Sequence, residues 1–156
     1  MPESWRTIVA SALDAREAHV AFDRAVAGLA PDLRGIRPEG LPHSAWDLLE
    51  HVRIAQADLI AYMEDPTYAA PVWPQGYWPS TSEPPTESAW DDAVAAVEHG
   101  RARLKALVLE LPDPTAAIPW GGDHTYLRCI LVALDHEAYH VGQLVVVRRL
   151  LGAWPG

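Results

Sequence analysis

The residues of this sequence best suited to chemistry are two histidines, His136 and His140, which stand four residues apart in the text DHEAYHVGQ. In an α-helix a four-residue step advances about 40° around the axis and about 6 Å along it, so the two imidazoles share one face. Two imidazoles at this spacing can bind one divalent cation. The other residues on this face are mostly apolar, which predicts that it points into a helical bundle: Cys129, Val132, Ala133, Gln143, Val147 and Leu151.

A site that holds a transition metal tightly normally takes a third protein ligand, which must come from another part of the chain. His51 is the first candidate, because it lies at the edge of an apolar helical stripe, and His19 is the second. We interpret the remaining three histidines as loop or surface residues: His43, His99 and His124. Spacing alone leaves a structural alternative open, since buried histidines often only hydrogen-bond to carbonyl groups or water.

The letters HEAYH from His136 to His140 also match the H-E-x-x-H motif of zinc proteases, in which the glutamate is the general base. Such a protease needs a sheet beside this helix, with an edge strand that receives the peptide, and the chain has no strand pattern. We therefore do not expect Glu137 to act as that base. It projects about 100° away from His136, where it could orient a ligand, face solvent or contact a second subunit.

Four stretches of the sequence have the three- and four-residue apolar periodicity of amphipathic helices. They are separated by connections rich in proline and glycine, and they run from about residue 4 to 29, 44 to 65, 88 to 111 and 125 to 151. The pairs Ser44 with Asp47 and Ser88 with Asp91 have the spacing of a helix start signal. Helices about 30 Å long predict an all-α fold, a four-helix bundle with long inter-helix loops, in a single domain over residues 1–156.

Two connections are of interest for function. The segment Pro66–Pro85 holds six prolines interleaved with aromatic residues, and it exceeds the ~12–15 residues of an ordinary structureless loop. We expect it to be ordered, either as a strap over the core or a dimer contact, or as a wall of a substrate pocket. The segment Ile118–His124 could shape the mouth of the pocket, and it could also be a tight turn with Asp123 or Thr125 as the N-cap.

The composition excludes several classes of protein. The 156 residues include 21 acidic and 12 basic side chains, a formal net charge of -9, which argues against binding to nucleic acid phosphates. Cys129 is the single cysteine, which excludes an intrachain disulfide, and it is predicted to be a core residue rather than a nucleophile. The start MPESWR lacks the features of a signal peptide, and no run approaches the ~18 apolar residues of a membrane span. We expect a cytoplasmic protein with no membrane or nucleic acid partner.

Two segments of the chain resemble a known family. The texts SAWDLLEHV, from Ser44, and DHEAYHVGQL, from Asp135, are similar in order and separation to those of the DinB/YfiT-like metalloenzymes, four-helix bundles, over nearly the whole chain. The resemblance implies a metal triad formed by His51, His136 and His140, with water or substrate completing the coordination. Members of this superfamily include S-transferases that use low-molecular-weight thiols, a mycothiol-dependent isomerase and many proteins of unassigned activity.

The function that the resemblance implies is that of a divalent-metal protein, with zinc favoured and nickel or iron as alternatives. The expected activity is a metal-dependent transfer of a low-molecular-weight thiol to a small electrophile. A metal-dependent hydrolase and a non-catalytic, metal-stabilised bundle that binds a small ligand stay open as alternatives. The apolar fourth helix and the 7 tryptophans predict a homodimer. Gln143, Tyr139 and Asp47 lie near the histidine face, and spacing does not decide which of them orients an imidazole.

Overall fold

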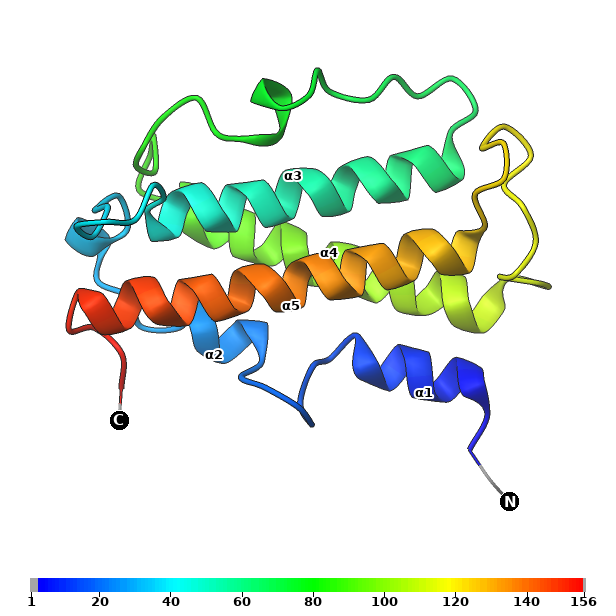
Figure 1. Ribbon diagram of the computed structural model, residues 1–156, viewed down its shortest axis with the longest axis horizontal. Helices are drawn as coiled ribbons and strands as arrows, with labels where there is room; N and C mark the ends of the chain where they lie inside the picture. Colours follow the sequence, from blue (N-terminus) through cyan, green and yellow to red (C-terminus); the bar gives the residue numbers. More distant parts are fainter. Residues whose placement is uncertain (1–2, 156) are drawn as a thin grey trace.

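Three long helices and two short ones form the molecule (Figure 1), as a computed structural model describes it for residues 3–155. Within these residues there are no strands, only an isolated bridge between Ala117 and Thr125, so the all-α prediction is confirmed. The helices are α1 (Trp5–Ala12), α2 (Phe22–Val26), α3 (Ala45–Glu64), α4 (Ala89–Glu110) and α5 (Tyr126–Leu150), with 3₁₀ turns at Pro31–Leu33 and Gln75–Tyr77.

The direction of the helices explains the long Pro66–Pro85 connection. Figure 1 shows that α3 and α4 run the same way, while α5 and the N-terminal pair run the opposite way. Two neighbouring parallel helices need a connection that returns along the length of the bundle, which for helices of this size is about 30 Å. The segment between α3 and α4 makes this return along the outer side of α3.

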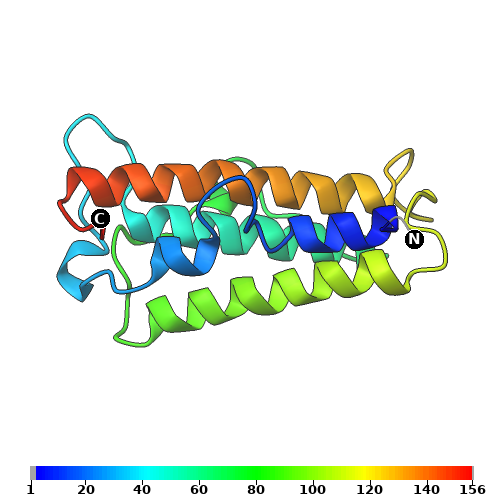
Figure 2. The same ribbon diagram turned by 90° about the horizontal axis from the view of Figure 1, so that it is seen from below.

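The first predicted helix is wrong as a continuous element, because the stretch from 4 to 29 folds as α1 and α2 with an irregular link between them. Ala15 in this link has a φ of 49°, in the left-handed region that a helix cannot contain. The two pieces lie end to end (Figure 2) and pack on different helices, α1 on α4 and α2 on α5. Asp14 also binds the Lys105 ammonium of α4 at 2.8 Å, which holds the link in place.

The starts of the long helices follow their sequence signals in two cases of three. Ser44 Oγ accepts from the Asp47 amide at 3.1 Å and the Asp47 carboxylate accepts from the Ser44 amide at 2.9 Å, so α3 begins with a complete capping box. Thr125 Oγ1 accepts from the Arg128 amide and caps α5. Ser88 forms no side-chain cap, because its backbone is already helical at φ -82° and ψ -17°.

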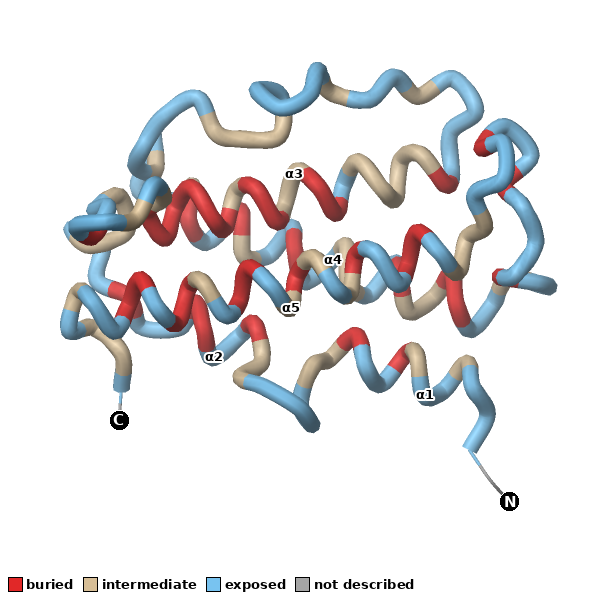
Figure 3. Tube along the Cα trace, in the orientation of Figure 1, coloured by how far each residue is buried: buried red, intermediate tan, exposed pale blue. Residues whose placement is uncertain are grey.

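Figure 3 shows buried residues along the helices, whereas the connecting segments are mostly exposed. The buried apolar residues form two clusters. Phe22, Leu49 and Leu144 belong to the first cluster, and Met63 and Ile130 belong to the second. Helix α5 contributes to both and is long and apolar enough to cross a membrane by length and composition alone. Its inner side packs as a core helix, whereas its outer side leaves several large apolar residues exposed: Leu131, Val132, Tyr139, Val146 and Leu150.

Candidate metal centre

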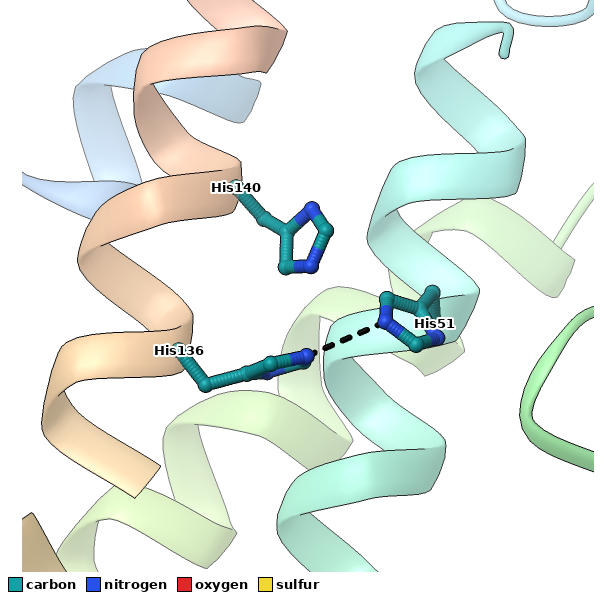
Figure 4. A group of neighbouring side chains, drawn as sticks. All are labelled: His51, His136 and His140. Atoms are coloured by element: carbon teal, nitrogen blue, oxygen red, sulfur yellow. Dashed lines mark hydrogen bonds between the residues drawn. The ribbon is translucent and has the colours of Figure 1, made fainter. Parts of the chain in front are cut away.

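The structure brings His51 of α3 together with His136 and His140 of α5 (Figure 4). One ring nitrogen of each lies within 4.8 Å of the others, and the Nε2 atoms of His136 and His51 are 3.0 Å apart. Zinc–imidazole bonds of about 2.0–2.1 Å require that two nitrogens on one ion lie within about 4.2 Å of each other. Side-chain shifts of under about 1 Å therefore bring all three within reach of one ion.

In His51 and His140, a hydrogen bond from one ring nitrogen determines which other nitrogen is free to bind a metal ion. His51 Nδ1 lies 2.7 Å from the Tyr77 carbonyl oxygen, which can only accept, so this nitrogen carries the proton. His140 Nδ1 in the same way donates to Gln143 Oε1 at 2.6 Å. The Nε2 atoms of His51 and His140 thus keep their lone pairs, as metal-binding imidazoles require.

The three imidazoles are neutral near pH 7. Burial lowers the pKa of His136 to about 4 and that of His140 to about 4, and the charge of a neighbouring histidine acts in the same direction. Burial also lowers the pKa of His51. A set of three neutral imidazoles fits a divalent transition metal, because the metal competes with no proton at physiological pH.

The segment Pro66–Pro85 contributes to this centre through two of its residues. Besides the Tyr77 carbonyl, the ring of Trp78 stacks on His51 with centroids 4.0 Å apart and planes 4° apart. The hydroxyl of Tyr68 donates to Asp58 of α3 at 3.0 Å and ties the segment to the helix. The connection is therefore a strap over α3 that also contacts a triad histidine, and none of its residues lines the cavity described below.

His43 lies in the loop before α3, as expected, but it is half-buried and belongs to the surroundings of the triad. Its ring stacks on the other face of Trp78, with centroids 4.0 Å apart, so Trp78 lies between His43 and His51. His43 is half-buried, and burial lowers its pKa. It is separated from the triad by one aromatic ring and is the residue of the site that the sequence interpretation missed.

A cavity of about 320 Å³ lies between the start of α3 and the C-terminal half of α5. No triad histidine lines it, but Gln143, the hydrogen-bond partner of His140, does. Its apolar lining comes from Leu41, Pro42, Leu48, Val146 and Val147. The remaining lining residues are Gly142 and three with polar atoms, His43, Tyr139 and Gln143. No residue of the Ile118–His124 loop lines it, so that loop is the tight turn capped by Thr125 and does not shape this pocket.

Glu137 points away from the triad, into the contact between α5 and the other helices. Its carboxylate accepts from Arg101 Nη2 of α4 at 2.7 Å, and the Gln56 amide of α3 lies 3.5 Å away. Burial raises the pKa of Glu137, and the guanidinium of Arg101 opposes that rise. A carboxylate held in this ion pair cannot serve as the general base of the H-E-x-x-H motif, so the protease interpretation is excluded.

The other candidates from the sequence lie outside the triad. His19, the second choice as a third ligand, is exposed in the link between α1 and α2 and hydrogen-bonds to the neighbouring carbonyl of Val20. Asp47 is used by the α3 cap and by Arg37, so of the three orienting candidates Gln143 is the one that contacts a triad histidine through a hydrogen bond. Cys129 is fully buried, as predicted for a core residue.

Removing the carbonyl of Gln143 is expected to weaken metal binding by about 10–100-fold, because the His140 ring then loses the partner that fixes its tautomer and orientation. The change is Gln143→Ala, and the affinity is measured by competition with a chromogenic chelator. Gln143→Glu is the matched control, since it keeps an acceptor at the same place and should retain the affinity. Equal affinity of Gln143→Ala and the unmodified protein would show that the hydrogen bond does not orient His140.

The metal-free protein is expected to lose stability as the pH falls from 7 to 5. The folded-state pKa of about 4 for His136 and His140 lies below the ordinary value of 6.5, so the unfolded chain binds protons first. The contribution of the two histidines to the free energy of unfolding is therefore complete above pH 6.5 and declines towards pH 4. At pH 5 we expect the pair His136 and His140 to have lost about 2 kcal/mol, a figure reduced for their partial exposure to solvent. The free energy of unfolding is measured by urea unfolding in the presence of a chelator, for the unmodified protein and for a His136→Gln/His140→Gln variant. The same pH dependence in both proteins would contradict the prediction.

Comparison with known families shows a match to the DinB superfamily over residues 15–144. The matched region contains α2 to α4, most of α5 and all three triad histidines. The chain therefore belongs to the DinB superfamily, with a three-histidine cluster that is compatible with metal binding. No curated protein and no solved structure matches the chain.

Proposed function

We propose that this protein is a metal-dependent transferase that joins a low-molecular-weight thiol to a small electrophile at the His51, His136 and His140 centre. The observation that carries the proposal is the convergence of three neutral imidazoles from two helices. Three protein ligands leave a further coordination position, as in catalytic rather than structural zinc sites. A bound divalent ion, zinc in first place, would supply a Lewis acid that lowers the pKa of a thiol or water in that position.

The residues around the triad support a reaction at this place. Gln143 and the Tyr77 carbonyl orient two of the rings, and the ring of Trp78 covers His51 against solvent. The protein's own thiol is unsuited to the reaction, because Cys129 is fully buried and its burial raises the pKa. A thiol that reacts at this centre therefore has to come from a small molecule in solution.

The proposal is tested with an electrophile, monochlorobimane, offered together with cysteine, glutathione or mycothiol. We expect conjugation with at least one thiol that disappears after removal of metal by chelation and returns when zinc is added. Turnover that survives complete metal removal would overturn the proposal. A product that carries water in place of the thiol would identify a hydrolase, and binding without any turnover would identify a non-catalytic ligand-binding bundle.

A homodimer formed through α5 is part of the same proposal. The exposed apolar residues on the outer side of this helix, among them Leu131, Val132 and Leu150, lie within about 100° of one another around the helix axis and so follow one face. A stripe of this kind is typical of helix–helix contacts between subunits. Light scattering across working concentrations tests it, and a monomeric mass throughout would refute it.

A further inference from the structure

We propose that the cavity next to Gln143 and Tyr139 binds the apolar body of a small, uncharged molecule and holds its polar end beside the groups that contact His140. The inference goes beyond the proposed function, because the cavity lies behind His140, on the side of its Nδ1 atom, and no triad histidine lines it. The cavity volume of about 320 Å³ lies at the lower end of the ~300–1,000 Å³ typical of small-molecule sites. It therefore suits a molecule of roughly one substituted aromatic ring rather than a peptide or nucleotide.

The lining determines the charge of the ligand. The side chains of Leu41, Leu48 and Val147 give the cavity an apolar surface, and no aspartate, glutamate, lysine or arginine lines it. The ionic pair nearest in sequence is closed on itself, since Arg37 Nε binds the Asp47 carboxylate at 2.9 Å. A charged ligand would lose its hydration here without gaining an ionic partner, which is costly, whereas an uncharged apolar ligand gains by leaving water.

The polar groups of the cavity are its links to the triad and so determine the orientation of the ligand. Gln143 accepts the hydrogen bond of His140, and the ring of Tyr139 packs against His140 with centroids 4.9 Å apart. His43 reaches His51 through the ring of Trp78, which stacks on both. A ligand whose apolar part contacts the valines and leucines therefore has its polar end beside groups that contact metal ligands.

Gly142 allows the cavity to be filled without disturbing the fold. A Cβ atom added at this position meets no atom within 4 Å, so a larger side chain extends into open space. In an α-helix most residues are also more favourable than glycine, by up to ~1 kcal/mol. Gly142→Leu is thus expected to occupy part of the cavity while leaving the unfolding free energy unchanged or raised.

The test uses three probes of the same size that differ in charge: 4-methylbenzyl alcohol, 4-methylbenzoate and 4-methylbenzylamine. Binding is measured by NMR titration of the protein at pH 7.5. We expect the alcohol to bind at least tenfold more tightly than either ion, and Gly142→Leu to lose at least tenfold in affinity for it. Arg149→Leu, which adds the same side chain on exposed α5 surface outside the cavity, should bind as the unmodified protein does.

Equal binding of the three probes, or full affinity in Gly142→Leu, would overturn the inference. The titration is repeated on the His51→Ala/His136→Ala/His140→Ala variant, which has no metal site. This repeat distinguishes a failure of the cavity inference from a failure of the proposed function. Alcohol binding that persists there shows that the cavity is a ligand site whether or not the centre holds metal. Metal bound by the unmodified protein without any cavity binding would instead support the centre and reject this ligand site.

Discussion

A His136→Ala variant is expected to purify with less than a tenth of the metal that the unmodified protein holds. His136 contributes the Nε2 atom that lies 3.0 Å from that of His51, so its removal leaves two ligands of a three-ligand site. The remaining pair lies on two different helices, and two imidazoles alone hold a transition metal weakly. Elemental analysis after overnight dialysis against a weak chelator measures the difference.

The matched controls are His19→Ala and His99→Ala, because both histidines are exposed and neither belongs to the triad. Both variants should retain the metal content of the unmodified protein, and His51→Ala should lose it as His136→Ala does. Circular dichroism of each variant excludes unfolding as the cause. Full metal content in His136→Ala, or an equal loss in His19→Ala, would show that the three histidines are a packing feature of the core.

A Glu137→Ala variant is expected to lose about 3–5 kcal/mol of unfolding free energy and to keep its metal. The carboxylate is buried against the guanidinium of Arg101, whose side chain is only 14% exposed, so the change leaves a buried charge without a partner. Arg101 also lies over the ring of Phe22 at 5.2 Å, and its Nε atom has no hydrogen-bond acceptor. The Arg101 guanidinium therefore has few other contacts that could replace the ion pair with Glu137.

Urea unfolding and metal analysis of the same preparation separate the two roles of Glu137. Glu137→Gln serves as the control, because it has the same shape, keeps an acceptor for Arg101 and should be destabilised by less. A Glu137→Ala protein that is fully stable would contradict the role of the ion pair. Loss of catalytic turnover in a stable Glu137→Gln protein would show that Glu137 takes part in the reaction.

The sequence predicts the three long helices closely, because their ends carry local signals such as the Ser44 and Asp47 capping box. It fails for the first stretch, where the apolar spacing is compatible with one helix, and only packing on two different partners explains the break at Ala15. The spacing of His136 and His140 is local and could be read directly. No local rule connects His51 with His136, which is 85 positions away. The choice of His51 as third ligand therefore depends on its apolar helical stripe and on the family resemblance.

The parts of the site that the sequence did not predict depend on contacts between distant segments. The acceptor for His51 is the backbone carbonyl of Tyr77, and a carbonyl is present at every position, so it carries no sequence signal. The partner of Glu137 is Arg101 of α4, 36 residues away. Other charged residues of α4 also have a spacing compatible with this contact, so the sequence does not single out Arg101. A signal for His43 did exist, because it directly precedes the Ser44 cap of the helix that carries His51.

The order of the elements along the chain has a consequence for biosynthesis. His51 belongs to the second quarter of the described chain, whereas His136 and His140 belong to α5, the last of its helices to be translated. A nascent chain that has completed α3, α4 and the strap therefore presents only one of the three triad imidazoles. A three-histidine site is complete only after α5 has packed against α3, so an ion held by all three histidines would mark a molecule whose helices are already assembled.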